Sequence, residues 1–205
     1  MSRYFVTGTD TGVGKTEVAS ALLGLMRARG LSPFALKPYE SGGGDDGKRL
    51  KARVLYRFAQ PLAPGVAAAL EGKKTDFAKV LKAIPKKGAG VVEGAGGLFV
   101  PLDAQHDVID LIERAKLPVV LVARLGLGTL NHTALSLEAL KHRKVQVAAV
   151  VLVKSTRGKD PSEQHNPRWL ARRHPGLRIL GPVTYLEHRA RRFAALERVL
   201  TPLIP

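Results

Sequence analysis

The sequence predicts an α/β fold in which a doubly wound, mostly parallel sheet carries helices on both faces. Short apolar runs alternate along the chain with segments whose apolar residues recur every three to four positions. The runs are continuously apolar, as is typical of parallel strands covered on both faces. Hydrophobic residues make up 45% of the chain and aromatic residues only 5%, so the core is expected to be aliphatic. No repeat or linker interrupts the 205 residues, which predicts a single domain over 1–205.

The first elements are a strand over Arg3–Thr7 and a helix over Lys15–Arg29, separated by a glycine-rich turn. The helix has apolar residues at the 3.6-residue period, and a glycine follows its last residue. Phe34–Lys37 has the composition of a second short strand. Glu40–Gly47 is polar and rich in glycine, so a loop is expected there, of the kind that often carries function on an α/β scaffold.

Three helical segments are expected in the middle of the chain, over Lys48–Ala59, Gly65–Leu70 and Asp76–Ile84, because prolines and glycines separate them. Gly90–Glu93 is the next apolar run and predicts a third buried strand, which a Gly-Ala-Gly-Gly turn follows. Val108–Ala115 then returns to helical periodicity.

The last third repeats the alternation of strands and helices. Pro118–Ala123 and Val145–Val153 are apolar runs, and the second is the most hydrophobic of the chain. Between them, Thr129–His142 has helical periodicity after a Gly-Leu-Gly turn. The remaining expected elements are a helix over Gln164–Arg173, a strand over Arg178–Leu180 and a helix over Arg189–Leu200.

Composition excludes several classes of function. The chain has no cysteine, so disulfides, thiolate metal sites and cysteine nucleophiles are excluded. No apolar run approaches the ~20 residues of a membrane span, and the first residues lack a signal-peptide core, which fits a cytoplasmic protein. The net charge of +16 favours anionic partners. Basic clusters without interleaved aromatic residues argue against nucleic acid among those partners.

The segment Gly8-Thr-Asp-Thr-Gly-Val-Gly-Lys-Thr16 joins the first expected strand to the first expected helix. Backbone N–H groups and the helix dipole gather at such a junction and favour a bound phosphate. Lys15 could reach the outer phosphates, and the Thr16 hydroxyl could bind Mg²⁺. The strict pattern would place its first glycine at Thr9 rather than Gly8, so a plain glycine-rich turn is the alternative. The strand–loop–helix context favours the phosphate-binding loop of P-loop NTPases.

Further candidate residues follow other expected strands. Glu93 ends an apolar run, and a carboxylate at the carboxyl end of a parallel strand points into the ligand crevice, where it could bind Mg²⁺. Asp45 and Asp46 offer a third oxygen ligand, or merely a solvated turn. Lys37 could neutralise a transferring phosphoryl group, although a lone lysine is more often a surface residue. Gly126-Leu-Gly-Thr-Leu-Asn131 opens a helix and could bind a carboxylate, or could be an ordinary capped start.

Together these segments resemble the dethiobiotin synthetase family. Gly8–Thr16 matches the family's G-T-D-T-x-V-G-K-T signature, and Lys37-Pro38 with Ser41-Gly42 matches its lysine–proline step. Val92–Gly97 matches V-E-G-A-G-G, and Leu127-Gly-Thr-Leu-Asn-His132 matches L-G-x-x-N-H. The resemblance spans nearly the whole chain.

The resemblance implies an ATP-dependent and Mg²⁺-dependent ligase of biotin biosynthesis. In that reaction 7,8-diaminopelargonic acid takes up CO₂ as a carbamate, and the carbamate oxygen attacks the γ-phosphate of ATP. The second amine then closes a ureido ring on the mixed carbamic–phosphoric anhydride and expels phosphate. The resemblance also implies a homodimer with a shared active site. In it, the helix start at Asn131 of one subunit receives the carboxylate of the substrate that the other subunit binds.

The resemblance implies these roles residue by residue. Lys37 and Lys15 are the catalytic lysines, and Thr16, Asp46 and Glu93 hold Mg²⁺, with Asp46 preferred over Asp45 because of its spacing to Leu50. Substrate contacts come from Thr11, Lys37, Ser41, Gly128 and Asn131. Nucleotide contacts come from Gly12, Val13, Gly14, Lys15, Thr16, Glu17, Asp46, Glu93, Gly94, Ala95 and Gly96. The base lies between Val153, Lys154, Val183, Thr184 and Tyr185.

The chain departs from the family pattern at three positions. Gly12 stands where some relatives have Glu, and Thr184 stands where the family has Pro. Val153-Lys154 replaces an Asn that reads adenine in many relatives, which leaves base recognition open.

Two other functions were weighed against this one. A partition or septum-site switch ATPase shares the expected fold, but it usually carries a second lysine early in the loop, where this chain has Asp10. An amidotransferase-type synthetase of the cobyrinic-acid pattern would normally need a cysteine, and the chain has none.

Overall fold

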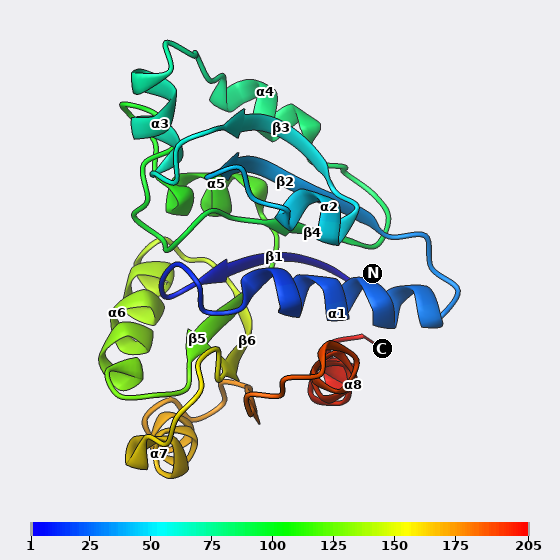
Figure 1. Cartoon of the computed structure of the whole chain (residues 1–205), viewed down its shortest axis with the longest axis vertical. Coiled ribbons are helices and arrows are strands. Elements are labelled where there is room, and N and C mark those ends of the chain that lie inside the picture. The colour runs from blue at the N-terminus through cyan, green and yellow to red at the C-terminus, as the bar shows by residue number, and fades with distance from the viewer. Residues whose placement is uncertain (1, 205) are drawn as a thin grey trace.

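The computed structural model describes residues 2–204, and a seven-stranded sheet forms its centre (Figure 1). The strand order is β3-β2-β4-β1-β5-β6-β7, and every neighbouring pair is parallel. The strands are β1 (Arg3–Gly8), β2 (Phe34–Ser41), β3 (Arg53–Phe58), β4 (Gly90–Glu93), β5 (Val119–Arg124), β6 (Val147–Val153) and β7 (Ile179–Val183). The α/β fold class with a parallel sheet is therefore confirmed.

Helices lie on both faces of the sheet, and α1 and α8 are neighbours on one of them (Figure 1). The helices are α1 (Lys15–Ala28), α2 (Asp46–Leu50), α3 (Pro64–Leu70), α4 (Phe77–Ala83), α5 (Val108–Ala115), α6 (Thr129–His142), α7 (Asn166–Arg173) and α8 (Arg189–Leu200). Two 3₁₀ turns, Pro161–Gln164 and Thr201–Leu203, complete the described elements. Within residues 2–204, no helix combines the length and the hydropathy that a membrane span requires.

The sheet separates two hydrophobic cores, because successive residues of each strand face opposite sides. In β1, Tyr4 and Val6 join the core beneath α1 and α8, whereas Phe5 joins the core beneath α5 and α6. Residues of β4 and β5 divide in the same way between the two cores. Continuous apolar runs are thus required in the central strands, since both faces are covered.

The expected helix over Lys48–Ala59 is wrong. Only its first residues are helical, in α2, and Arg53–Phe58 forms the edge strand β3, which pairs with β2. The segment Arg-Val-Leu-Tyr-Arg-Phe is rich in residues that favour strands, and pairing with β2 satisfies its backbone. The second strand is also longer than expected, so Lys37 lies inside β2 and not at its end.

The strand order places the loop after β1 at the centre of the sheet. β1 pairs with β4 on one side and with β5 on the other. The chain therefore leaves β1 at the point where the connections between strands diverge to the two faces of the sheet. Val6 of β1 lies beside Glu93 of β4, so the carboxyl ends of these strands are neighbours. Ligands of open α/β sheets bind at this kind of position.

Candidate active site

A cavity of about 530 Å³ opens at the carboxyl ends of β1, β2 and β4. Its lining includes thirteen of the residues expected from the sequence: Thr11, Gly12, Gly14, Lys15, Thr16, Glu17, Lys37, Ser41, Asp46, Glu93, Gly94, Ala95 and Gly96. Val13 instead packs into the core beneath the loop. The fold thus brings three loops, far apart in sequence, around one volume of the size of a ligand site.

The loop between β1 and α1 has the geometry of an anion cradle. Gly14 caps the N-terminus of α1 with φ of 100°, a left-handed conformation that a side chain rarely adopts. A Cβ atom on Gly14 would also lie 3.2 Å from Cγ1 of Val153. No side chain caps this helix, so its first N–H groups remain free for a ligand.

Lys15 is almost fully buried at the base of this loop, and its Nζ donates a hydrogen bond to the carbonyl oxygen of Asp10 at 2.8 Å. Burial lowers the pKa of Lys15 to about 8, although the carboxylate of Glu93 opposes this shift. A buried ammonium held by one carbonyl has donors to spare, which suits it to phosphate oxygens.

Lys37 crosses from β2 to the carboxylates of the neighbouring segments. Its Nζ lies 2.6 Å from Oε1 of Glu93 and 3.3 Å from Oδ2 of Asp46. The Thr16 hydroxyl donates to the same Oε1 at 2.8 Å. Burial disfavours the charge of Lys37, but Glu93 and Asp46 more than offset that effect and raise its pKa. The ammonium therefore stays charged at the centre of the cluster.

The oxygens around Lys37 fit a magnesium ion. Oε2 of Glu93 is buried and has no hydrogen-bond partner among the described residues, so one carboxylate oxygen is available as a ligand. The Thr16 hydroxyl and the Asp46 carboxylate supply further hard oxygen donors. No group of three His, Cys, Asp or Glu side chains gathers as a metal site in residues 2–204. Mg²⁺ commonly takes only one or two carboxylates together with substrate phosphates and water.

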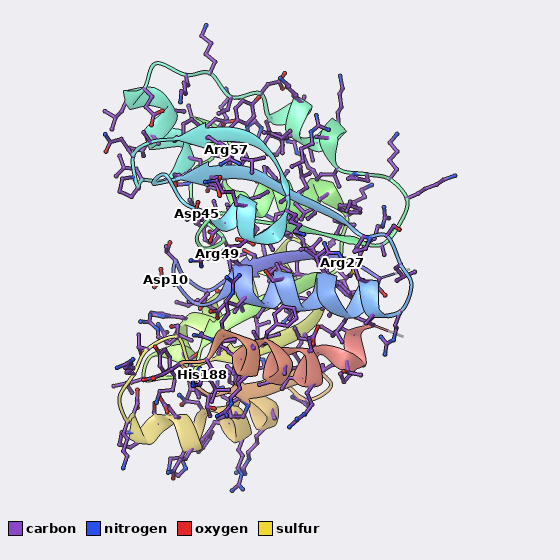
Figure 2. The ribbon with its side chains drawn as sticks, turned by 45° about the vertical axis from the view of Figure 1, so that its right-hand side comes forward. Asp10, Arg27, Asp45, Arg49, Arg57 and His188 are labelled. Carbon is purple, nitrogen blue, oxygen red and sulfur yellow. The ribbon has the colours of Figure 1, made fainter. Side chains whose placement is uncertain are left out.

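The two neighbouring aspartates occupy different positions. Asp46 begins α2 and reaches Lys37, as described above. Asp45 is exposed and lies 3.2 Å from Nζ of Lys48 (Figure 2 labels Asp45 at the start of α2). The structure therefore brings Asp46, and not Asp45, into the cluster with Glu93.

An ion pair that sequence reasoning missed, between the buried carboxylate of Glu40 and the half-exposed guanidinium of Arg57, holds α2 in place. Oε1 of Glu40 accepts the N–H of Gly47 at 2.6 Å, and its Oε2 lies 2.5 Å from the guanidinium of Arg57. Gly47 is required there, because a Cβ atom would lie 2.5 Å from Val54. Since Gly47 directly follows Asp46, Glu40 positions Asp46 through the backbone.

The base-side residues lie at the ends of β6 and β7. The N–H of Lys154 donates to the carbonyl of Val183 at 2.8 Å, so Val153, Lys154 and the segment up to Tyr185 form one wall. Lys154 pairs with Glu163 at 2.7 Å. A second cavity, of about 300 Å³, lies here and is lined in part by Lys154, Thr184 and Tyr185.

Arg192 of α8 joins this wall to the phosphate loop. Its guanidinium lies 2.7 Å from Oε2 of Glu17, donates to the carbonyl of Lys154 at 3.3 Å, and lies 5.6 Å from the ring centre of Tyr185. The residue belongs to a basic run that sequence reasoning treated as surface charge.

Gly128 and Asn131, at the N-terminus of α6, lie apart from the main cavity. Both are exposed and neither lines it. Within residues 2–204 the site is therefore assembled without these two residues.

The cavity also has lining residues that sequence reasoning did not single out: Tyr39, Glu40, Arg49, Pro61, Leu62, Ala63, Pro64, Val100, Ser155 and Arg192. Pro61 and Pro64 were visible only as breaks between expected helices. Glu40 carried a weak signal, because it stands between a lysine–proline step and Ser41-Gly42.

Known proteins similar to this chain identify its family. The AAA domain family profile matches residues 2–191. An ATP-dependent dethiobiotin synthetase of Anaeromyxobacter sp. (strain K) is 46% identical over 190 residues, which cover 84% of this chain and 85% of that relative. Another, of Anaeromyxobacter dehalogenans (strain 2CP-C), is 44% identical and covers 100% of this chain and 99% of that relative.

Solved structures agree with the fold. A plasmid partition protein from Borrelia burgdorferi superimposes with a TM-score of 0.60 over 99% of both chains, at 10% sequence identity. A likeness at this identity shows the fold alone, whereas the identity to the synthetases is high enough to show kinship. The chain belongs to the family of ATP-dependent dethiobiotin synthetases.

Proposed function

We propose that this protein catalyses the ATP-dependent closure of a ureido ring on 7,8-diaminopelargonic acid with CO₂, giving dethiobiotin, ADP and phosphate. The family supports an ATP-dependent ligase of biotin biosynthesis. The observation that carries the proposal is the cluster in which the Lys37 ammonium meets Glu93 and Asp46, next to Lys15 and the phosphate loop. A charge cluster at the carboxyl ends of parallel strands suits phosphoryl transfer, which depends on positioning and charge neutralisation.

The reaction begins with a carbamate formed from one amine of the diamine and CO₂. A carbamate oxygen attacks the γ-phosphorus of ATP, ADP leaves, and the other amine closes the ring while phosphate is expelled. Lys15 and Lys37 would neutralise charge on the transferring phosphoryl group, and the first N–H groups of α1 would hold the phosphates. Thr11 and Ser41, which line the same cavity, would contact the diamine.

Magnesium belongs to this proposal, with Thr16, Asp46 and Glu93 as its protein ligands. When bound, Mg²⁺ would neutralise phosphate charge and orient the triphosphate. Lys37 now lies among the same oxygens, so its ammonium would be released toward the phosphoryl group when those carboxylates turn to a metal. This release would link metal binding to the placement of the catalytic lysine.

A homodimer is the second part of the proposal. Three large apolar side chains near the start of α6 are strongly exposed: Phe99 (64%), Leu127 (80%) and Leu135 (63%). Phe99 and Leu135 also line a cavity of about 440 Å³ with Thr9, Asp10 and Thr11 of the phosphate loop. A second copy that covers this face would bring its own α6, with Gly128 and Asn131, toward the diamine. Sedimentation at equilibrium tests the dimer, and Leu135→Asp is expected to yield monomers.

An assay that depends on the diamine tests the proposed activity. Purified protein with Mg²⁺, ATP, bicarbonate and 7,8-diaminopelargonic acid is expected to release one phosphate per ureido ring formed. Omission of the diamine or of bicarbonate is expected to reduce ATP hydrolysis to background. ATP hydrolysis that DNA stimulates and the diamine does not would instead favour a partition-type switch.

A further inference from the structure

A groove that neither the triphosphate nor the diamine accounts for runs along α1. It has a volume of about 360 Å³, and its walls come from α1, α2 and α8. On α1 the lining residues run from Thr16 to Arg27 along one helix face, a span of about 16 Å. Figure 2 shows Arg49 near the start of α1 and Arg27 toward its end, so the groove follows the helix between them.

Four arginines line this groove, and we call it the arginine groove: Arg27, Arg49, Arg189 and Arg192. Only Arg192 has a carboxylate partner within 4.0 Å, Glu17, among the described residues. Arg27, Arg49 and Arg189, on three different helices, thus share one cavity, and none of them has a carboxylate within 4.0 Å among the described residues, which favours a multiply charged anion.

The floor of the groove is apolar. Leu23, Leu50 and Leu196 are buried beneath it, and Phe193 is half-buried at its side. Gly24 allows this packing, since a Cβ atom there would lie 2.9 Å from the ring of Phe193. A ligand with an apolar or aromatic body would therefore contact hydrocarbon while its charged group met the guanidiniums.

The arginine groove adjoins the main cavity and shares four lining residues with it: Thr16, Glu17, Arg49 and Arg192. Lys15, Lys37 and Glu93 do not line it, and neither do Lys154 and Tyr185 of the base side. The ion pair between Glu17 and Arg192 is part of this shared boundary. Binding of a ligand in the groove could therefore affect the phosphate loop through Glu17.

We propose that the arginine groove binds a soluble small molecule that carries a phosphate monoester and an apolar body. A phosphate monoester carries nearly two negative charges at neutral pH and accepts hydrogen bonds from several guanidiniums at once. The volume of the groove is that of a small-molecule site. The proposal is independent of the ring-closing reaction and accounts for part of the basic excess of the chain.

Calorimetric titration of the full-length protein with 1-naphthyl phosphate tests the proposal. The titration is made with saturating Mg²⁺ and ADP, so that the phosphate loop is occupied. One site per chain is expected, with an affinity at least about tenfold above that of inorganic phosphate and with no binding of 1-naphthol. Absence of saturable binding under these conditions, or an equal affinity for inorganic phosphate, overturns the proposal.

Two matched double variants localise the site. R27A/R189A is expected to weaken 1-naphthyl phosphate binding at least about tenfold. R191A/R198A removes the same charge from exposed positions of α8 that do not line the groove, and it is expected to bind as the unaltered protein does. Equal losses in the two variants would mean that only the overall charge attracts the probe, and the assignment of the groove would be wrong.

Discussion

The phosphate side and the base side of the proposed nucleotide site are built differently. On the phosphate side, Lys37 and Glu93 come from adjacent central strands and their side chains are only 6% and 1% exposed. On the base side, the pair of Arg192 and Glu17 comes from two helices, and the side chains are 12% and 38% exposed. In the proposed reaction, the groups that would stay in place during phosphoryl transfer are thus fixed by the sheet, and the groups that would hold the base are fixed by helix termini and loops.

The contrast has an energetic consequence. Removal of one partner from a buried ion pair leaves an uncompensated charge and costs about 3–5 kcal/mol, whereas an exposed pair contributes about 0–1 kcal/mol. Substitutions on the phosphate side should therefore affect both stability and turnover. Those on the base side should affect affinity alone.

The largest effect is expected for Lys37→Ala. Loss of the ammonium removes charge neutralisation at the phosphoryl group, and kcat is expected to fall roughly 100- to 1,000-fold. ATP should still bind, because Lys15 and the first N–H groups of α1 remain. Steady-state kinetics and calorimetric titration of ATP measure the two quantities. Near-normal turnover of this variant would contradict the catalytic role of Lys37.

This variant needs a control for folding, since Glu93 would be left buried without its partner. The double variant K37A/E93Q removes both charges, so it should recover most of the lost melting temperature without recovering turnover. Lys73→Ala, which removes an exposed lysine paired with Glu71, should leave turnover unchanged.

The next effect separates the two aspartates. Asp46 is held in the cluster with Lys37, so Asp46→Asn is expected to raise the Mg²⁺ concentration for half-maximal activity by at least about 100-fold, beyond the effect typical of outer-shell residues. Asp45→Asn is the matched control and should leave this Mg²⁺ concentration unchanged, since Asp45 only pairs with exposed Lys48. Equal effects of the two substitutions would contradict the assignment of Asp46.

Local signals in the sequence predicted the conformation of the segments that form the proposed phosphate side. The loop Gly8–Thr16 and the strand ending at Glu93 are each a contiguous segment. The positions of the glycines predict the loop, and an apolar run predicts the strand. The strand β3 was missed because no glycine or proline separates its segment from the short helix before it, although its residues favour a strand and pairing with β2 stabilises it.

That single error hid a supporting interaction of the site. Glu40 and Arg57 are direct neighbours in the register of β2 and β3, so their ion pair exists only if Arg53–Phe58 is a strand. Arg192 was missed for a related reason, since its contacts come from segments separated by up to 175 residues, at Glu17. Long-range pairings of this kind leave no pattern in one sequence.

A smaller effect is expected for Glu40→Gln. The amide can still accept the Gly47 N–H but loses the charge that faces Arg57, so α2 and Asp46 are held less firmly. The Mg²⁺ requirement is expected to rise about tenfold with kcat retained at saturating Mg²⁺. Glu40→Asp keeps the charge and should rescue part of the loss. A fall in kcat that Mg²⁺ does not restore would mean that Glu40 acts on the fold and not through Asp46.

The smallest effect is expected on the base side, for Arg192→Ala. This substitution frees Glu17, the carbonyl of Lys154 and the ring of Tyr185 together, yet all three contacts are partly solvated. KM for ATP should therefore rise only about three- to fivefold, with kcat unchanged, because a partly exposed pair contributes about 1 kcal/mol or less. Arg191→Ala, at the next exposed position of α8, is the control and should change neither constant. If kcat fell while KM held, Arg192 would act on the phosphate side through Glu17, and the division between the two regions would not hold at α8.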